Sequence, residues 1–225
     1  MTIEDLMDFD LFIDLSDEQL NAVLKVCHRQ TFKRDNMIVI EEEAGTNLYL
    51  ILEGKVKISR ISDDGREVIL SILTEGDFFG EMSVIDGSTR SANVTSIDNS
   101  ELIVIKREDF MSLLHQHPQI AINLLEELVA RLRRSDQQIK ALSLQDAVGK
   151  VASAILRLAE NEGIIKNNEV IINKVPSQQD LANMAGTSRE TISRVLKSLS
   201  NDNYLTKDGS KIIITAYDRF KMDFS

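Results

Sequence analysis

A heptad pattern between Pro118 and Gln145 is the sequence feature that most limits how this chain can fold. Apolar or small residues recur there in alternating steps of three and four, at Leu125, Leu128, Leu132, Ser135, Ile139 and Leu142. This period is typical of a two-stranded helical seam, whereas a helix that packs on its own domain shows a broader apolar stripe. The pattern predicts a dimerisation helix about 40 Å long. A solvated amphipathic helix that covers its own domain is the alternative.

The composition indicates a globular protein with room for two domains. The chain has 225 residues, of which 43% are hydrophobic, and it has no apolar run long enough to cross a membrane. Its acidic N-terminus differs from a basic secretory signal, so we expect a cytoplasmic protein without a membrane partner. Cys27 is the only cysteine, which excludes an intrachain disulfide and a thiolate metal cluster built from one chain.

The charge is divided unevenly along the chain. Residues 1–145 carry 15 Lys and Arg against 26 Asp and Glu, a net charge of −11, and residues 146–225 carry 11 against 10, a net charge of +1, which together give −10. The acidity therefore belongs to the N-terminal part. The C-terminal part can still present a basic face to DNA, although its electrostatic attraction to phosphate would be modest.

Short alternating runs between Thr31 and Ile105 predict a β-roll. Gly-containing turns separate most of the expected strands, which span residues 37–40, 48–52, 56–61, 68–73, 92–97 and 102–105. Many short strands at regular spacing are typical of a jelly roll. A helical region that runs to about Arg29 should precede them, with Ser16 and Gln19 as a capping box. The histidines all lie outside the expected strands, which argues against a histidine-bound metal enzyme of this fold.

The segment from Phe78 to Ala92 carries residues suited to a phosphorylated ligand. Gly80 would let the backbone approach a ligand closely, and the N–H groups at the start of a short helix would favour an anion. Arg90 could bind phosphate oxygens through two N–H groups. Glu81 would be repelled by phosphate and suits a sugar hydroxyl instead. The alternative is a plain loop with a glycine turn and an exposed arginine.

The C-terminal part has the pattern of a winged helix-turn-helix. A helix is expected over residues 148–158. Ser177 can cap the next helix, Gly186 makes the turn, and Thr187 can cap a second helix. A hairpin over residues 203–215 then supplies the wing.

The second helix of this motif predicts a DNA-reading surface. Its apolar residues recur at 192, 195, 196 and 199, which turns the polar residues outward. Arginine and glutamate are residue types that bind guanine and cytosine edges in the major groove. The local alternatives for Glu190 are a capping box with Thr187 and an ion pair with Arg194. The residues expected at the DNA are Ser177, Gln178, Thr187, Ser188, Arg189, Glu190, Ser193, Arg194 and Lys197.

The motif FFGEMSVIDGSTRSANV resembles the phosphate-binding cassette of cyclic-nucleotide-binding domains. Together with the β-roll and the seam helix, it makes the whole chain similar to the CRP/FNR family of bacterial transcription regulators, of the cAMP receptor type. The resemblance implies an α+β fold and no enzymatic activity. The implied parts are a cyclic-nucleotide-binding β-roll (jelly roll) over 1–117, a dimerisation helix over 118–145 and a winged helix-turn-helix DNA-binding domain over 146–225.

The resemblance also implies a ligand site, whose effector would be cAMP or a related cyclic nucleotide that acts allosterically. Gly80 and Glu81 would hold the ribose hydroxyl, and Arg90 and Ser91 the cyclic phosphate. Arg131 would reach back to this pocket from the long helix. In cAMP-responsive members two hydroxyl residues of that helix receive the adenine; this chain has Ser135 and Asp136 there, and Asp136 departs from the pattern. The expected ligand-binding residues are Gly80, Glu81, Met82, Ser83, Arg90, Ser91, Arg131, Ser135 and Asp136.

The segment TSRETISR at 187–194 resembles the recognition helix of the cAMP receptor branch. That branch reads TGTGA half-sites, so we expect a homodimer on a palindrome with half-sites about 34 Å apart, and RNA polymerase as a further partner. Two alternatives stay open. One is a regulator of the same fold with a vestigial pocket that needs no effector. The other is a cyclic-nucleotide-binding subunit that controls an enzyme, for which the helix-turn-helix would have no purpose.

Overall fold

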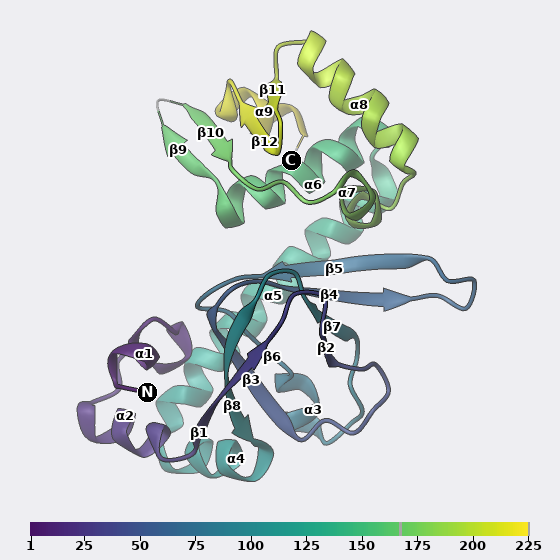
Figure 1. The fold of residues 1–225 in the computed structure, drawn as a ribbon. Helices are drawn as coiled ribbons and strands as arrows, with labels where there is room; N and C mark the ends of the chain where they lie inside the picture. Colours follow the sequence, from purple (N-terminus) through teal and green to yellow (C-terminus); the bar gives the residue numbers. More distant parts are fainter. Residues whose placement is uncertain (167, 225) are drawn as a thin grey trace. The chain divides into compact units, whose positions relative to one another are not determined.

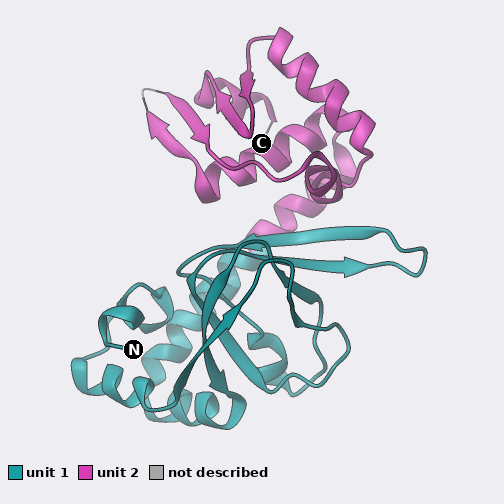
Figure 2. Ribbon diagram, viewed as in Figure 1, with its two compact units in different colours: residues 1–132 teal, residues 133–225 magenta. Residues whose placement is uncertain are grey.

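The computed structural model describes residues 1–166 and 168–224 and divides the chain into two compact units, residues 1–132 and 133–225 (Figure 2). The division falls inside the long helix α5 (Pro118–Leu144). The first unit holds a β-roll with short helices, and the second holds a winged helix-turn-helix (Figure 1). None of the described helices is both long and apolar enough to span a membrane.

Two four-stranded antiparallel sheets form the roll of the first unit. Their strand orders are β1-β8-β3-β6 and β2-β7-β4-β5. The predicted jelly roll is confirmed, and every expected strand is present. The strands are β1 (Cys27–Phe32), β2 (Met37–Val39), β3 (Asn47–Glu53), β4 (Val56–Ile61), β5 (Glu67–Leu73), β6 (Phe78–Phe79), β7 (Asn93–Ser96) and β8 (Ser100–Lys106).

The expectation that the helical region continues to about Arg29 is wrong. Helix α2 (Asp17–Leu24) ends earlier, and β1 begins at Cys27 and pairs with β8. Because β1 is an edge strand whose side chains are mostly exposed, its sequence lacks the apolar alternation that marks the other strands. The predicted capping box of α2 is confirmed, since Ser16 and Gln19 each accept the backbone N–H of the other.

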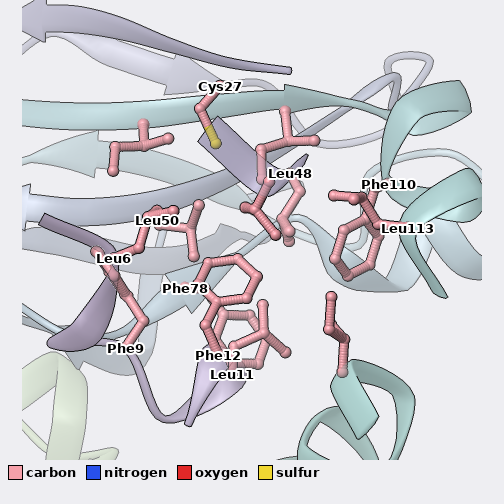
Figure 3. Close-up of a cluster of buried hydrophobic side chains, with 14 of the residues drawn as sticks. Leu6, Phe9, Leu11, Phe12, Cys27, Leu48, Leu50, Phe78, Phe110 and Leu113 are labelled. Carbon is pink, nitrogen blue, oxygen red and sulfur yellow. The ribbon is translucent and has the colours of Figure 1, made fainter. Parts of the chain in front are cut away.

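A hydrophobic cluster joins the N-terminal segment to the roll (Figure 3). The segment contributes Leu6 from α1 (Glu4–Met7) and Phe12 from the 3-10 turn η1 (Asp10–Phe12), and the roll contributes Phe78. Helix α4 (Arg107–Gln116) adds Phe110. Burial among these side chains raises the pKa of the Cys27 thiol to about 12, so this cysteine stays protonated and is part of the core.

Helix α5 packs one face against the first unit. Ile120 and Leu124 are buried, and the buried Asn123 amide donates to the carbonyls of Leu11 (3.2 Å) and Ile13 (3.1 Å). These two bonds satisfy backbone acceptors of the N-terminal segment that lie at the helix surface. The first half of α5 is therefore tied to both the N-terminal segment and the core.

The opposite face of α5 is exposed. Two residues of the predicted seam, Leu128 and Leu142, do not lie on this face. Leu128 packs partly against the core cluster, and Leu142 lies beside Gly186, where an added Cβ would be 3.1 Å from its Cδ2. Both leucines therefore face their own unit, Leu128 the core cluster of the first and Leu142 the turn at Gly186 of the second. Leu144, at the end of the helix, is exposed. The other exposed apolar residues of α5 follow one line along the helix, and we call them the uncovered stripe: Ile122, Leu125, Val129, Leu132 and Ile139.

The second unit has the predicted winged helix-turn-helix fold. Its sheet has the strand order β11-β12-β10-β9, and the hairpin of β11 and β12 is the wing. Neither β9 nor the last helix is expected from the sequence pattern. The elements are α6 (Ala147–Glu162), β9 (Ile164–Lys166), β10 (Glu169–Ile172), α7 (Gln178–Ala185), α8 (Arg189–Asn201), β11 (Leu205–Asp208), β12 (Lys211–Ile214) and α9 (Tyr217–Phe224).

Helix α9 packs against Tyr204, at the start of the wing. Tyr204, which immediately precedes β11, packs edge-on against Phe220 (5.8 Å between ring centroids) and Phe224 (5.2 Å). Its hydroxyl donates to Asp223 (2.7 Å), and the Arg219 guanidinium lies 4.6 Å from its ring centroid. These contacts fix the chain between the end of α8 and the first wing strand.

Candidate functional site

The cassette segment forms β6, the short helix α3 (Glu81–Asp86) and the loop that leads to β7. Gly80 joins β6 to α3 in a left-handed conformation, with φ of 85°. A Cβ at this position would lie 2.7 Å from Arg90 Nη1 and 2.9 Å from the Asn47 carbonyl oxygen. Gly80 is therefore required both by its backbone conformation and by the close approach of Arg90.

Arg90 is a buried cation held by uncharged acceptors. Its side chain donates through Nη1 to the Gly80 carbonyl (2.9 Å) and to Ser83 Oγ (2.8 Å), and through Nη2 to the Asn47 carbonyl (2.7 Å). The residue is only 7% exposed. These bonds use three of the five guanidinium N–H groups and leave two for another acceptor.

The charge of Arg90 has no partner of opposite sign in direct contact among the described residues. Burial lowers the pKa of its guanidinium, and the nearby Tyr49 and Glu81 oppose that effect only in part. Arginine nevertheless stays protonated in proteins. A buried positive charge that is hydrogen-bonded but not neutralised is suited by its chemistry to bind an anion.

Glu81 lies beside Arg131 of α5. Arg131 Nη1 is 3.4 Å from Glu81 Oε1, while stronger contacts hold the rest of its guanidinium: Nη2 donates to the Phe78 carbonyl (2.8 Å) and Nε to Glu127 (2.9 Å). Its Cζ also lies 4.3 Å from the centroid of the Phe78 ring. Glu81 is 5% exposed, and its contact with Arg131 is long. Its carboxylate therefore keeps capacity to accept a hydroxyl from a ligand.

The structure brings most, but not all, of the predicted ligand residues together. Ser83 is buried beneath Arg90, whereas Met82 and Ser91 are exposed at the surface of the cassette, 3.6 Å apart between sulfur and hydroxyl. Ser135 and Asp136 are exposed on the part of α5 that belongs to the second unit.

The loop before β3 lies against Arg90, which the sequence pattern does not indicate. A Cβ on Gly45 would lie 2.1 Å from Ser83 Oγ and 2.9 Å from Arg90 Nε, and the Asn47 carbonyl is one of the acceptors of Arg90. The only local signal is a glycine ahead of a strand, which marks a turn. The contact with the cassette depends on the fold of the roll.

In the second unit, α7 and α8 have the geometry of a helix-turn-helix. Ser177 Oγ caps α7 by accepting from the Asp180 N–H (3.1 Å), and Gly186 makes the turn with φ of 60°. The expectation that Thr187 caps the second helix is wrong: Ser188 Oγ accepts from the Thr191 N–H (3.2 Å), so α8 begins one residue later. Thr187 and Gln178 are half-buried.

Helix α8 turns its polar side chains outward. Ile192, Val195 and Leu199 are buried against the unit, as predicted. Arg157 of α6 contacts the first helix of the motif, since its Nη2 donates to the Met184 carbonyl at the end of α7 (3.1 Å). The exposed residues of the motif are Ser177, Ser188, Arg189, Glu190, Ser193, Arg194 and Lys197.

Glu190 is ionised at the first turn of α8. Hydrogen bonds from its own backbone N–H and from Ser188 lower the pKa of its carboxyl group. The capping box with Thr187 is wrong because Ser188 is the N-cap, and within residues 1–166 and 168–224 no ion pair joins Glu190 to Arg194. Arg194 and Glu190 are thus both presented to solvent.

The wing adds basic residues that the prediction omits. Lys207 and Lys211 are exposed on the paired strands β11 and β12, on either side of the Asp208-Gly209 turn. Lysine is one of the residue types that donate to DNA phosphates. With Arg189, Arg194 and Lys197 they give the second unit two groups of exposed cations.

Comparison with known proteins identifies both units. The cyclic nucleotide-binding domain family matches residues 29–117, and the Crp-like helix-turn-helix domain family matches residues 149–222. A CRP-like cAMP-activated global transcriptional regulator of Mycobacterium tuberculosis is 30% identical over 93% of this chain and 93% of its own. The cyclic AMP receptor protein of Thermus thermophilus is 35% identical over 85% of this chain and 86% of its own.

Solved structures agree with this assignment. The catabolite activator protein of Thermus thermophilus is 31% identical, with a TM-score of 0.55 over 94% of this chain and 96% of its own. FixK2 of Bradyrhizobium japonicum is 22% identical and shares the fold, with a TM-score of 0.76 over 88% of this chain and 96% of its own. The sequence relatives are transcription regulators and not enzymes. The buried arginine of the cassette and the outward helix α8 thus belong to a member of the CRP/FNR family, a cyclic-nucleotide-responsive transcription regulator that binds DNA.

Proposed function

We propose that this regulator is a homodimer whose effector is cAMP or a closely related cyclic nucleotide. The observation that carries the proposal is the buried, unneutralised guanidinium of Arg90. A cyclic phosphate supplies one negative charge and the oxygen acceptors that the two remaining N–H groups require. A relative that is 30% identical bears the name of a cAMP-activated regulator.

The remaining contacts follow from the same placement of the phosphate. Ser91 would donate to it, and Gly80, Met82 and Ser83 would shape the cassette around it. Glu81 would accept the ribose hydroxyl, with Arg131 holding its carboxylate in place. Ser135 and Asp136 of α5 would meet the base.

The proposed DNA target is a palindrome of TGTGA-like half-sites. Arg189, Glu190 and Arg194 are the residues that would read base edges, since arginine pairs with guanine and glutamate with cytosine. The other contacts would be to the backbone, from Ser177, Gln178, Thr187, Ser188, Ser193 and Lys197. Two-fold symmetry of a homodimer matches that of the palindrome.

The proposed mechanism is a shift between two arrangements of the dimer. The parts would be an effector domain over 1–117, a dimerisation helix over 118–145 and a DNA-binding domain over 146–225. Ligand that prefers one arrangement of the α5 pair would set the spacing of the two α8 helices. The expected setting is the bacterial cytoplasm, with RNA polymerase as a further partner.

Calorimetric titration tests the effector directly. The full chain is titrated with cAMP, cGMP and cyclic dinucleotides, and each is then tested for a change in affinity for a TGTGA palindrome. Saturable binding of cAMP with tighter DNA binding is the expected result. DNA binding that is strong and unchanged by every nucleotide would instead support a vestigial pocket.

A further inference from the structure

The linker between α5 and α6 is bonded to the C-terminal helix α9. Gln145, which follows the last residue of α5, donates through Nε2 to the Phe224 carbonyl of α9 (3.3 Å). Ser153 of α6 donates to Gln145 Oε1 (2.7 Å), and its Oγ lies 3.1 Å from the same Phe224 carbonyl. A serine hydroxyl has one proton, which these two acceptors share or alternate. We call Gln145, Ser153 and the Phe224 carbonyl the linker network.

The backbone of the linker is also held on both sides. The Gln145 N–H donates to the Ala141 carbonyl of α5 (3.1 Å), and Asp146 Oδ1 accepts the Gly149 N–H at the start of α6 (2.9 Å). Gly149 is buried, and a Cβ added to it would lie 2.9 Å from the Gln145 Cβ. The Gln145 side chain is thus packed as well as bonded. The linker therefore cannot turn without breaking hydrogen bonds.

Phe224 connects the linker network to the end of α8. Its carbonyl belongs to the network, while its ring packs against Tyr204 (5.2 Å between ring centroids). Tyr204 lies between α8 and β11. Its N–H donates to the Leu199 carbonyl of α8 (2.9 Å), and its carbonyl accepts the Thr215 N–H (3.1 Å), which follows β12. One residue of α9 therefore contacts both the linker and the point where α8 meets the wing.

The last turn of α5 contacts the other end of α8 directly. Leu142 lies beside Gly186, in the turn that precedes α8. Helix α8 is thus connected to α5 near its N-terminus through Leu142 and near its C-terminus through the linker network. Packed side chains and hydrogen bonds of this kind transmit a movement from one element to the next. An element held at both ends follows its support, whereas an element held at one end can pivot.

We infer that Gln145 and Ser153 are positioning residues for DNA binding: through the linker network they make α8 and the wing follow the last turn of α5. A movement of α5 driven by the effector then reaches α8 at both ends. Without the network, α8 keeps the contact with Leu142, but its C-terminal end and the wing lose their bonded connection to the linker.

Relaxation dispersion of backbone amides tests the inference on the full chain without nucleotide. Ser153→Ala removes a hydroxyl of the network, and Gln145→Met removes the amide while keeping a side chain of similar length. In each variant the population of an open state at the Tyr204 and Thr215 amides should rise about fivefold, the effect of losing one net hydrogen bond. The amides of α7 should keep their wild-type relaxation, because Leu142 still contacts the turn that follows them.

The matched control removes a similar bond elsewhere. Gln116 Nε2 donates to Ser112 Oγ (2.9 Å) at an exposed position of α4, so Ser112→Ala should leave the relaxation at Tyr204 unchanged. Wild-type relaxation at Tyr204 in either network variant overturns the inference. An equal rise throughout α7 also overturns it, since the network would then only stabilise the unit. If Ser153→Ala does not fold, Gln145→Met alone decides.

DNA binding gives a functional readout, and only this measurement rests on the proposed effector and target. The affinity of the full chain for a TGTGA palindrome is measured with and without saturating cAMP, and the ratio of the two affinities is the coupling. Gln145→Met should reduce this ratio about fivefold, and Ser112→Ala should keep it. Adding Ser153→Ala to Gln145→Met should cause little further loss, because both residues act through one network.

Two failures of the DNA measurement have different meanings. A wild-type ratio in Gln145→Met, or a further loss in the double variant equal to that of Ser153→Ala alone, overturns the inference while the proposed effector stands. A wild-type chain whose DNA affinity ignores cAMP refutes the proposed effector, and the relaxation measurement then decides the inference by itself.

Discussion

Replacing Arg90 by alanine should destabilise the first unit as well as abolish the response to ligand. The substitution removes the three bonds to Gly80, Ser83 and Asn47. Bonds from a charged donor contribute about 1.5–3 kcal/mol each. Two effects reduce the sum: removing the guanidinium recovers the cost of burying it, and water can reach the vacated acceptors. A net loss of about 2–3 kcal/mol is expected.

Differential scanning calorimetry measures this loss. For a unit of 132 residues, each 1 kcal/mol lowers the unfolding midpoint by about 4 °C, so the expected decrease is about 8–12 °C. Saturating cAMP should raise the midpoint of the wild-type unit and leave that of Arg90→Ala unchanged. Arg66→Ala is the control, because Arg66 is exposed and, among the described residues, its side chain pairs only with Asp64 on the same turn.

Two results would refute this reasoning. A wild-type midpoint in Arg90→Ala would mean that the three bonds contribute nothing to the cassette. A rise with cAMP that equals the wild-type rise would mean that the phosphate binds elsewhere. Arg66→Ala should match the wild type in both measurements.

Three other substitutions or treatments test separate parts of the structure. Gly45→Ala should abolish nucleotide binding in calorimetry, because its Cβ would collide with Ser83; wild-type affinity would contradict the proposed pocket. Glu190→Ala should reduce discrimination at one base pair of the half-site about tenfold or more in competitive gel shifts; an unchanged order of preference would show that Glu190 does not read DNA. Cys27, whose pKa burial raises to about 12, should react with a thiol reagent at pH 8 only after unfolding; rapid labelling of the native chain would contradict its burial.

The roll and the winged motif are predictable because their signals are local. Apolar alternation, glycine turns and the caps at Ser16 and Ser177 each act within a few residues, and the structure confirms them. One exception is the cap of α8, which is Ser188 and not Thr187. Another is β1, an edge strand that buries only Cys27 well. Its conformation is set by pairing with β8, a partner distant in sequence, so the local pattern carries no signal for it.

The candidate pocket is predictable only in its linear part. Gly80, Glu81 and Arg90 lie within one motif, and the structure adds Gly45 and Asn47, which reach Arg90 from another loop. Likewise, the residue spacing predicts a seam on α5 but does not determine which face of the helix carries it. The packing of Leu128 on the core and of Leu142 beside the second unit's turn settles which face is uncovered.

The two bonds from Asn123 to the carbonyls of Leu11 and Ile13 limit where the long helix can bend. A swing of its first half would break both bonds or move the N-terminal segment with it, and either movement costs free energy. Bending is therefore expected nearer the exposed residues that follow Leu132, where no such anchor is described. A spin label on each side of Leu132 would locate the pivot of the proposed switching motion.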